Sequence, residues 1–431
     1  MHLYDVPMIF ILVGLTLYVV LASADFGAGF WQLLAGPRGE RVRDHAHDSI
    51  GPVWEANHVW LIFVLTVTWT AYPTAFGAIA STLCLPLFIA VIGIVMRGAT
   101  YALRAGAATA SERRRIDLPF ALSSVIAPFA LGTVIGAIAA RRVPVGNAAG
   151  GLISSWTSPT SLIVGALAVA TSAYLAAVFM AADAQRIERE VDGRHEEASL
   201  VAALRTRALL SGVVAGAVAL AGLLVLHGDA HFLYARLLRG AALAAVIVSA
   251  IAGLATLELV RRERFEPARY SAALAVAAIV AGWALGQRPL LLEGLTVQQA
   301  AAPHDTLVLV VVAVLAGAVI LFPSLALLFR LVLGGRLDDH HGDPTSAIPA
   351  KQRESLDLLL AVSRAGLLAR LASAGLLAGF GLLTVAEAGW AHAAGVLALL
   401  GFLVCGFFAV VPAQLAELER EERAGAPGAE R

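Results

Sequence analysis

The chain has 431 residues, of which 59% are hydrophobic and only 14% are charged, and its mean hydropathy is +0.80. Soluble domains carry about 25% charged residues because their surfaces face water. The composition therefore excludes a soluble enzyme, a disordered chain and a nucleic-acid-binding protein. The net charge is zero, from 31 basic and 31 acidic residues. Cys84 and Cys405 both lie in apolar runs with no CxxC pair, so neither a disulfide nor a zinc site is indicated.

Runs of about 20 apolar residues, the length that crosses a bilayer as a helix, recur along the chain. Eleven such runs predict an all-α polytopic membrane protein with about 11 transmembrane helices. They cover about residues 7–25, 53–72, 76–97, 120–140, 161–182, 208–227, 238–259, 270–287, 306–330, 371–386 and 393–412. No Lys or Arg precedes the first run, which favours a retained helix over a signal peptide.

Basic residues are divided unequally between the two sides of these spans. Five of the 31 fall on one side, namely Arg141, Arg142, Arg236, Arg239 and Arg288. The remaining 26, among them Arg97 and Arg104, fall on the side of the loop that follows the first span. The positive-inside rule places the basic side in the cytoplasm. We therefore expect the N-terminus outside and the C-terminus in the cytoplasm.

The spans divide the chain into three regions. Residues 1–335 hold nine spans, residues 336–365 form a polar cytoplasmic linker, and residues 366–431 hold two further spans and a charged tail. His340-His341 in the linker favours a solvated loop over a metal site, because no helical spacing organises these ligands. A faint repeat links Tyr18 and Ala24-Asp25 to Tyr174 and Ala182-Asp183. This repeat predicts that the first eight spans form two four-helix bundles of the same orientation.

Acids within membrane spans need partners or a function, because charge is costly in lipid. Asp25 lies 18 residues after Pro7, which at 1.5 Å per residue places it about 27 Å along the helix, close to the cytoplasmic boundary. Glu55 re-enters at about the same depth, and His58 shares its helix face at i+3. Two interpretations remain open, a proton inlet and an interfacial anchor of acids, amides and Trp.

Haem binding by this chain is not favoured by its histidines. Membrane haems usually take axial His or Met ligands from helices. Nearly all of the eleven histidines fall in loops or at span ends, and His58 lies clearly within a span, near its edge. The four methionines offer no obvious partner ligand.

Two segments together resemble subunit II of the cytochrome bd-type quinol oxidases. These are ADFGAG at residues 24–29 and GPVWEANHVWLI at residues 51–62, followed by YPTAFG at residues 72–77. The resemblance implies a bacterial cytoplasmic-membrane subunit of an enzyme that oxidises quinol and reduces dioxygen to water. It further implies that haems b and d reside on a partner, subunit I, against which this chain packs and to which it helps deliver protons.

The resemblance also assigns roles to single residues. Glu55 occupies the acidic position linked to proton delivery, in the form typical of the cyanide-insensitive-like branch, and Asp25 matches the acidic position of the first-helix motif. His58 stands where other members have Gln, so a relay role for it is an open question. Supporting positions are Trp54, Asn57 and Trp60. No catalytic residue is expected in this chain alone.

Small accessory subunits, membrane lipid, quinol and a structural quinone are further partners that the resemblance leaves room for. The family is expected to have about nine helices, so the last two spans here are additional. The alternative function is a proton-coupled secondary transporter, and a third is a purely structural membrane scaffold. Acids near the cytoplasmic edge, rather than at the midplane, favour the oxidase subunit.

Overall fold

The computed structural model describes residues 2–35, 42–43, 45–46, 54–104, 110–190 and 195–333, with scattered residues between 370 and 405. The chain divides into two compact units, Met1–Phe322 and Pro323–Arg431. The predicted linker at residues 336–365 and most of the two last predicted spans lie outside the described residues. The boundary between the expected regions therefore stays a prediction.

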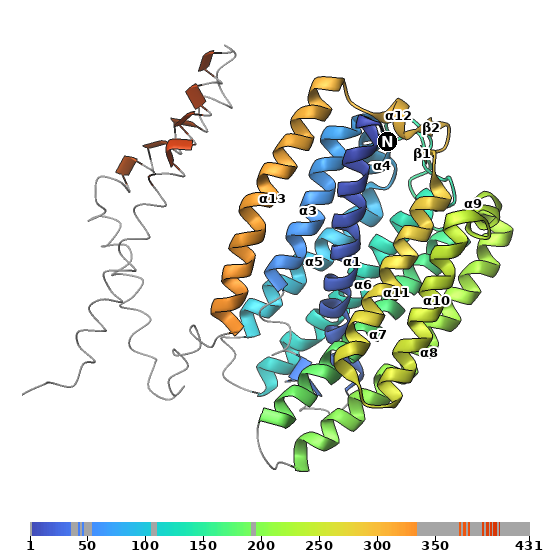
Figure 1. Cartoon of the computed structure of the whole chain (residues 1–431), viewed down its shortest axis with the longest axis vertical. Coiled ribbons are helices and arrows are strands. Elements are labelled where there is room, and N and C mark those ends of the chain that lie inside the picture. The colour runs from blue at the N-terminus through green and yellow to red at the C-terminus, as the bar shows by residue number, and fades with distance from the viewer. Residues whose placement is uncertain are drawn as a thin grey trace, which may run out of the picture. The chain divides into compact units, whose positions relative to one another are not determined.

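Helices make up almost all of the described chain up to residue 333 (Figure 1). In order they are η1 (Leu3–Asp5), α1 (Val6–Leu34), α3 (Trp54–Ala71), α4 (Pro73–Thr82), α5 (Cys84–Arg104), α6 (Ala110–Ala139), α7 (Pro159–Glu190), α8 (His195–Asp229), α9 (His231–Leu237), α10 (Gly240–Arg261), α11 (Phe265–Gln287), α12 (Val297–Ala300) and α13 (His304–Leu333). A small antiparallel hairpin, β1 (Leu290–Leu292) with β2 (Leu295–Thr296), turns at Gly294, whose φ of +74° suits glycine.

Seven of the described helices are long and apolar enough to cross a membrane. They are the helices at Leu3–Leu34, Cys84–Tyr101, Ile116–Ala139, Pro159–Arg189, Leu200–Asp229, Gly240–Arg261 and Phe265–Gln287. Shorter apolar helices cover Asn57–Ala71 and His304–Val319. The prediction of a helical multi-pass membrane protein is confirmed, and the total of eleven spans and their orientation stay predictions.

Several helices extend beyond the spans that hydropathy predicted. The first span was expected to end at Asp25, and this is wrong, because α1 continues for nine more residues to Leu34. The third span was expected at residues 76–97, but a break at Leu83 separates α4 from α5. Pro86 lies in the first turn of α5, where its missing N–H leaves no intrahelical hydrogen bond unmade.

Helix contacts repeat between the two halves of the described bundle. In the first half α1 contacts α3 and α6, and α5 contacts α6. In the second half α7 contacts α8 and α11, and α10 contacts α11. Between the halves, α6 contacts α7 just as α11 contacts α1, and α1 contacts α7 directly. These pairs are the ones expected from two equivalent four-helix units, α1, α3, α5, α6 and α7, α8, α10, α11 (Figure 1).

Glycine sets the distance between the first helices of the two units. A Cβ on Gly27 of α1 would collide with the carbonyl of Ser172 on α7 and with the side chain of Ala176. Small residues of this kind allow two backbones to approach closely where lipid supplies no hydrophobic drive. Gly27 therefore fixes the α1–α7 contact and, with it, the position of the neighbouring Asp25.

We predict that Gly27→Ala destabilises the protein, because the added methyl group forces the two backbones apart. Overpacking of this kind costs about 1–3 kcal/mol. The matched control is Gly253→Ala in α10, where nothing lies within 4 Å of the added Cβ. Thermal unfolding of the purified protein in detergent should show a lower midpoint for the first variant alone. Equal midpoints for the two variants would contradict the close α1–α7 contact.

Candidate functional site

The C-terminal half of α1 places a carboxylate inside the bundle. Asp25 is only 4% exposed although it lies among apolar helices. Two neighbouring residues shape the space around this carboxylate. Phe26 is buried beside it, and Gly29, which has no side chain, leaves room for side chains from α5 and α6. The ADFGAG segment is thus the part of α1 that accommodates a buried charge.

Arg97 of α5 is the counter-ion of this carboxylate. Its side chain is 0% exposed, and its Nη2 lies 2.5 Å from Asp25 Oδ1. The same nitrogen donates to the Asp25 carbonyl oxygen at 2.8 Å, while Nη1 donates to the hydroxyl of Ser124 on α6. Ser124 in turn donates to the Phe120 carbonyl at 2.7 Å. The ion pair therefore joins α1, α5 and α6.

Two aromatic rings contact the guanidinium group of Arg97. Its Cζ lies 4.3 Å from the centroid of the Phe120 ring and 5.3 Å from that of Phe26. Such cation–π contacts strengthen when water is excluded. Gly29 is required for this arrangement, because a Cβ there would collide with Ser124 Oγ and lie 2.9 Å from Arg97 Nη1.

The first turns of α3 complete the site. Asn57 is 0% exposed, and its Nδ2 donates to the Leu21 carbonyl of α1 at 3.3 Å. The His58 ring packs edge-on against Tyr18 and Phe26, with centroid distances of 6.4 Å to each. Trp60 contacts the apolar cluster around Tyr18. The segments of α1 and α3 that carry the two motifs therefore lie side by side, as expected.

Two of the predicted residues are placed by backbone alone. Trp54 and Glu55 form the first positions of α3, two or three residues before Asn57, and their side chains lie outside the described residues. Asn57 lies level with Leu21 of the antiparallel α1, so the backbone of Glu55 is within about one helical turn of the level of Asp25. The expected equal depth of the two acids is consistent with this position.

The helix that carries Asp25 is longer than the predicted span. Asp25 was expected close to the cytoplasmic boundary of the membrane, which stays a prediction, and nine residues of α1 follow it, a further length of about 13 Å. Arg97 was counted among the basic residues flanking the spans, yet it lies seven residues inside the end of α5. The physical reason is that each charge neutralises the other, so hydropathy alone misjudges where the helices end.

Arg97, Ser124 and Tyr18 belong to the site although the sequence did not single them out as site residues. The sequence does carry a signal for Arg97, because it is the one cation in the apolar run VIGIVMRGATYAL. The intramembrane acid Asp25 needed a partner of opposite charge, and Arg97 could have been proposed for that role. Serine and tyrosine in a helix carry no comparable signal, because both are common in transmembrane segments.

The second half of the bundle has its own ion pair. Asp183 of α7 lies 2.9 Å from Arg269 of α11, and Arg186 approaches Asp183 at 3.8 Å. Unlike the buried pair in the first half, this pair is partly exposed, with the side chain of Asp183 at 19% and that of Arg269 at 23%. The predicted repeat thus brings an acid to a comparable place, with a partner from a different helix of its unit.

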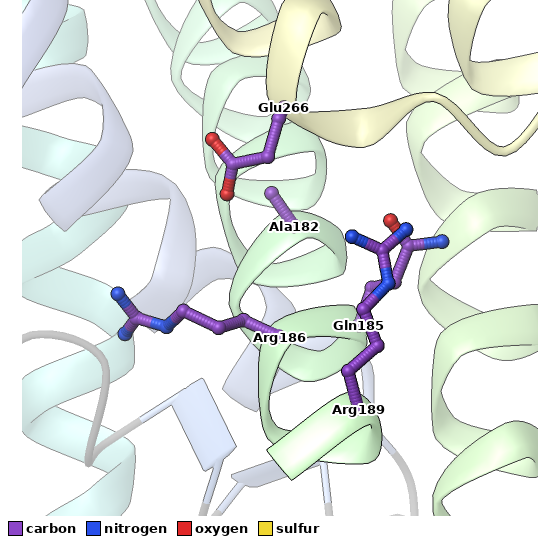
Figure 2. A pocket seen from close by; sticks show the side chains of 5 residues that line it. All are labelled: Ala182, Gln185, Arg186, Arg189 and Glu266. Carbon is purple, nitrogen blue, oxygen red and sulfur yellow. The ribbon is translucent and has the colours of Figure 1, made fainter.

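An open pocket of about 230 Å³ lies beside this second pair. Figure 2 shows that Glu266 approaches it from the start of α11, while Gln185, Arg186 and Arg189 come from α7. In this view Arg186 points to the opposite side from Arg189, so the two guanidinium groups do not converge on one ligand. The enclosed Asp25 cluster is the stronger candidate site.

Among the residues that the structure describes, no group of three or more His, Cys, Asp or Glu side chains could hold a metal ion. His58, the imidazole of the Asp25 cluster, lies edge-on to the rings of Tyr18 and Phe26. The described cluster holds charge and hydrogen bonds.

Fold and site together define a multi-pass helical membrane protein with a charged cluster buried inside its first helical unit. Residues 3–332 match the model of the cytochrome bd terminal oxidase subunit II family, and the chain belongs to this family.

Individual relatives agree with this assignment. The chain is 22% identical over 223 residues to a Bacillus subtilis (strain 168) protein with the provisional name of cytochrome bd menaquinol oxidase subunit II, covering 51% of this chain and 61% of that one. It is 27% identical over 132 residues to the cytochrome bd ubiquinol oxidase subunit 2 of the same organism, covering 31% and 39%. The matched stretches thus span less than two thirds of either relative.

A solved structure shares the fold. It is a chain of the bd oxidase from Geobacillus thermodenitrificans, with a TM-score of 0.59 and 24% sequence identity, covering 77% of this chain and 99% of that one. The predicted resemblance to bd oxidase subunit II is confirmed.

The buried ion pair gives a prediction about assembly. Removing one partner of such a pair leaves the other charge uncompensated, at a cost of about 3–5 kcal/mol, whereas replacing both is often neutral. Asp25→Asn and Arg97→Gln should each lower the yield and the melting temperature of the protein. The double variant should recover most of both, because Asn and Gln can hydrogen-bond to each other. A double variant no better than the single variants would contradict a structural pairing.

Proposed function

We propose that this chain is the non-haem membrane subunit of a quinol:oxygen oxidoreductase, packed against a haem-bearing subunit I. In this proposal the chain delivers cytoplasmic protons toward the site where dioxygen is reduced to water. The chain alone is not catalytic. Membership of the subunit II family supports this division of labour.

The proton route begins with Glu55 and passes the Asp25 cluster. The observation that carries this proposal is the buried polar cluster at the α1–α3 contact, where Asn57 and His58 face the Asp25 level of α1. A cluster of carboxylate, imidazole and hydroxyl groups enclosed by apolar helices can accept and release protons where lipid cannot. The positive charge of Arg97 also favours the ionised form of the neighbouring Asp25 carboxylate, so the region stays charged.

The orientation of the chain follows from its charge distribution. We propose that the end of the bundle at which α1, α5 and α7 terminate faces the cytoplasm of a bacterial cell, because most of the Lys and Arg residues lie on that side. Glu55 opens α3 at the same end, so its position suits uptake from the cytoplasm. The N-terminus would then lie outside.

The other members of the complex also belong to this proposal. Haems b and d, which carry the electron transfer and the oxygen chemistry, reside on subunit I. The exposed apolar residues of α8 and α10, such as Leu220, Leu224 and Leu254, contact lipid or a neighbouring subunit. In this proposal the other exposed faces of the described bundle are open to small accessory subunits and a structural quinone.

The test is Glu55→Gln in the assembled complex. Loss of an acid–base group on a required proton path should lower quinol-dependent oxygen consumption by at least about ten-fold, with the amount of complex unchanged. The matched control is Glu258→Gln, which makes the same chemical change at an exposed ion pair with Arg261 and Arg262 at the end of α10. Exposed pairs contribute little, so the control should behave as the wild type.

Wild-type oxygen consumption by the Glu55→Gln complex would remove Glu55 from the mechanism. Loss of the complex itself in both variants would instead show that the assay reports assembly. Spectroscopic haem content per complex separates these two outcomes.

A further inference from the structure

The corner between α8 and α9 brings three ring side chains together. His227 lies in the last turn of α8, and His231 and Tyr234 belong to α9. The ring centroids of His227 and His231 lie 5.4 Å apart, and that of Tyr234 lies 5.0 Å and 6.0 Å from them. α9 lies at the same end of the described bundle as the N-terminus (Figure 1). The group is therefore separate from the Asp25 cluster, which lies in the C-terminal half of α1.

The backbone keeps the two imidazoles on one face of this corner. Ala230 separates α8 from α9, with a φ of −135°. Helix-like hydrogen bonds nevertheless continue through it, from Ala230 N–H to the Leu226 carbonyl at 3.0 Å and from Tyr234 N–H to the Ala230 carbonyl at 3.1 Å. His227 and His231 therefore stand at i, i+4, a spacing at which side chains are neighbours.

A backbone hydrogen bond determines which nitrogen of His231 is free. Its Nδ1 lies 3.3 Å from the carbonyl oxygen of His227. Because a carbonyl oxygen can only accept, Nδ1 carries the hydrogen and Nε2 keeps its lone pair. Metal-binding histidines use this arrangement, in which one ring nitrogen donates to a backbone carbonyl and the other binds the ion. Both imidazoles are exposed, so an ion in water can reach them.

We propose that His227 and His231 form a binding site for a divalent transition-metal ion such as Zn²⁺ or Cu²⁺. Imidazole nitrogen suits both ions. Metal–nitrogen bonds of about 2.0–2.1 Å place the centroids of two bound imidazoles about 5 Å apart, close to the 5.4 Å seen here. No third His, Cys, Asp or Glu joins them in the part of the chain that the structure describes, so water completes the coordination. Such an open site binds its ion reversibly.

The charges around His231 tolerate a cation. His231 lines an open pocket of about 330 Å³ together with Asp229 and Glu293. Asp229 is neutralised by Arg142 at 2.9 Å, whereas Glu293 forms no ion pair with any described residue. Arg141, the other cation of the pocket, lies 3.5 Å from the centroid of a phenylalanine ring. Glu293 is thus the carboxylate that balances part of the charge of a bound ion.

A bound ion joins the last turn of α8 to the first turn of α9. Leu233 and Leu237 of α9 are buried and lie against Gly286 of α11. Holding α9 in place therefore stabilises this end of the second helical unit, to an extent set by the concentration of the ion relative to its dissociation constant. The site goes beyond the proposed proton delivery and does not rest on it.

The test is a Cu²⁺ titration of the purified full-length protein in detergent, followed by electron paramagnetic resonance, which detects coordinated imidazole nitrogen. His227→Gln and His231→Gln should each weaken binding at this site at least about ten-fold, since losing a ligand costs no less than losing the group that orients it. The matched control is His304→Gln, the same change at an exposed histidine at the start of α13. It should bind Cu²⁺ as the wild type does.

A second control replaces both His340 and His341 by glutamine, because this adjacent pair is another place where two histidines meet. The site at the α8–α9 corner should keep its wild-type affinity in this variant. Wild-type Cu²⁺ affinity in both His227→Gln and His231→Gln would overturn the proposal. Loss of imidazole-bound copper in the His340/His341 variant alone would overturn it as well.

Zn²⁺ gives an independent measurement on the same proteins. It should raise the melting temperature of the wild type and leave those of His227→Gln and His231→Gln unchanged, because the ion then no longer bridges α8 and α9. An equal rise in all three proteins would contradict the site. Proton delivery is tested separately by Glu55→Gln in the assembled complex, so either proposal can fail while the other stands.

Discussion

The buried ion pair between Asp25 and Arg97 is the interaction on which the first half of this protein depends. A charge in the apolar interior is tolerated only with a partner and satisfied hydrogen bonds. Here Arg97 supplies the counter-charge and hydrogen bonds to Asp25 Oδ1, the Asp25 carbonyl and Ser124, while Asp25 Oδ2 has no partner among the described residues. The pair joins three helices and leaves one carboxylate oxygen for other contacts. Structure and proposed chemistry therefore meet at the same side chain.

Small residues make this pairing possible. Gly29 lets Ser124 and Arg97 approach α1, and Gly27 lets α7 approach the opposite side of the same helix. Because bulky residues at these two positions would separate the helices, the ADFGAG motif follows from the packing around a buried charge. Phe26 contributes to the same end by covering the guanidinium group. The small residues and the phenylalanine of ADFGAG, the segment that carries the resemblance to the family, are thus explained by the packing around Asp25 and Arg97.

The helices and the meeting of the α1 and α3 motifs could be predicted from sequence because hydropathy and the paired motifs both report on them directly. The ends of α1 and α5 could not, since hydropathy assigns a charge to the membrane edge unless its partner is known. Arg97 was misplaced for this reason. The break before Pro86 was missed because the apolar run continues through it.

The central question about this protein is whether the Asp25 cluster conducts protons or merely holds helices together. The decisive measurement is proton uptake during oxygen reduction by the Asp25→Asn/Arg97→Gln complex in lipid vesicles. We expect a complex with normal haem content and stability whose proton uptake is slowed, because the neutral pair restores packing but not the carboxylate. Wild-type proton uptake by this assembled double variant would contradict it and leave the ion pair with a structural role alone.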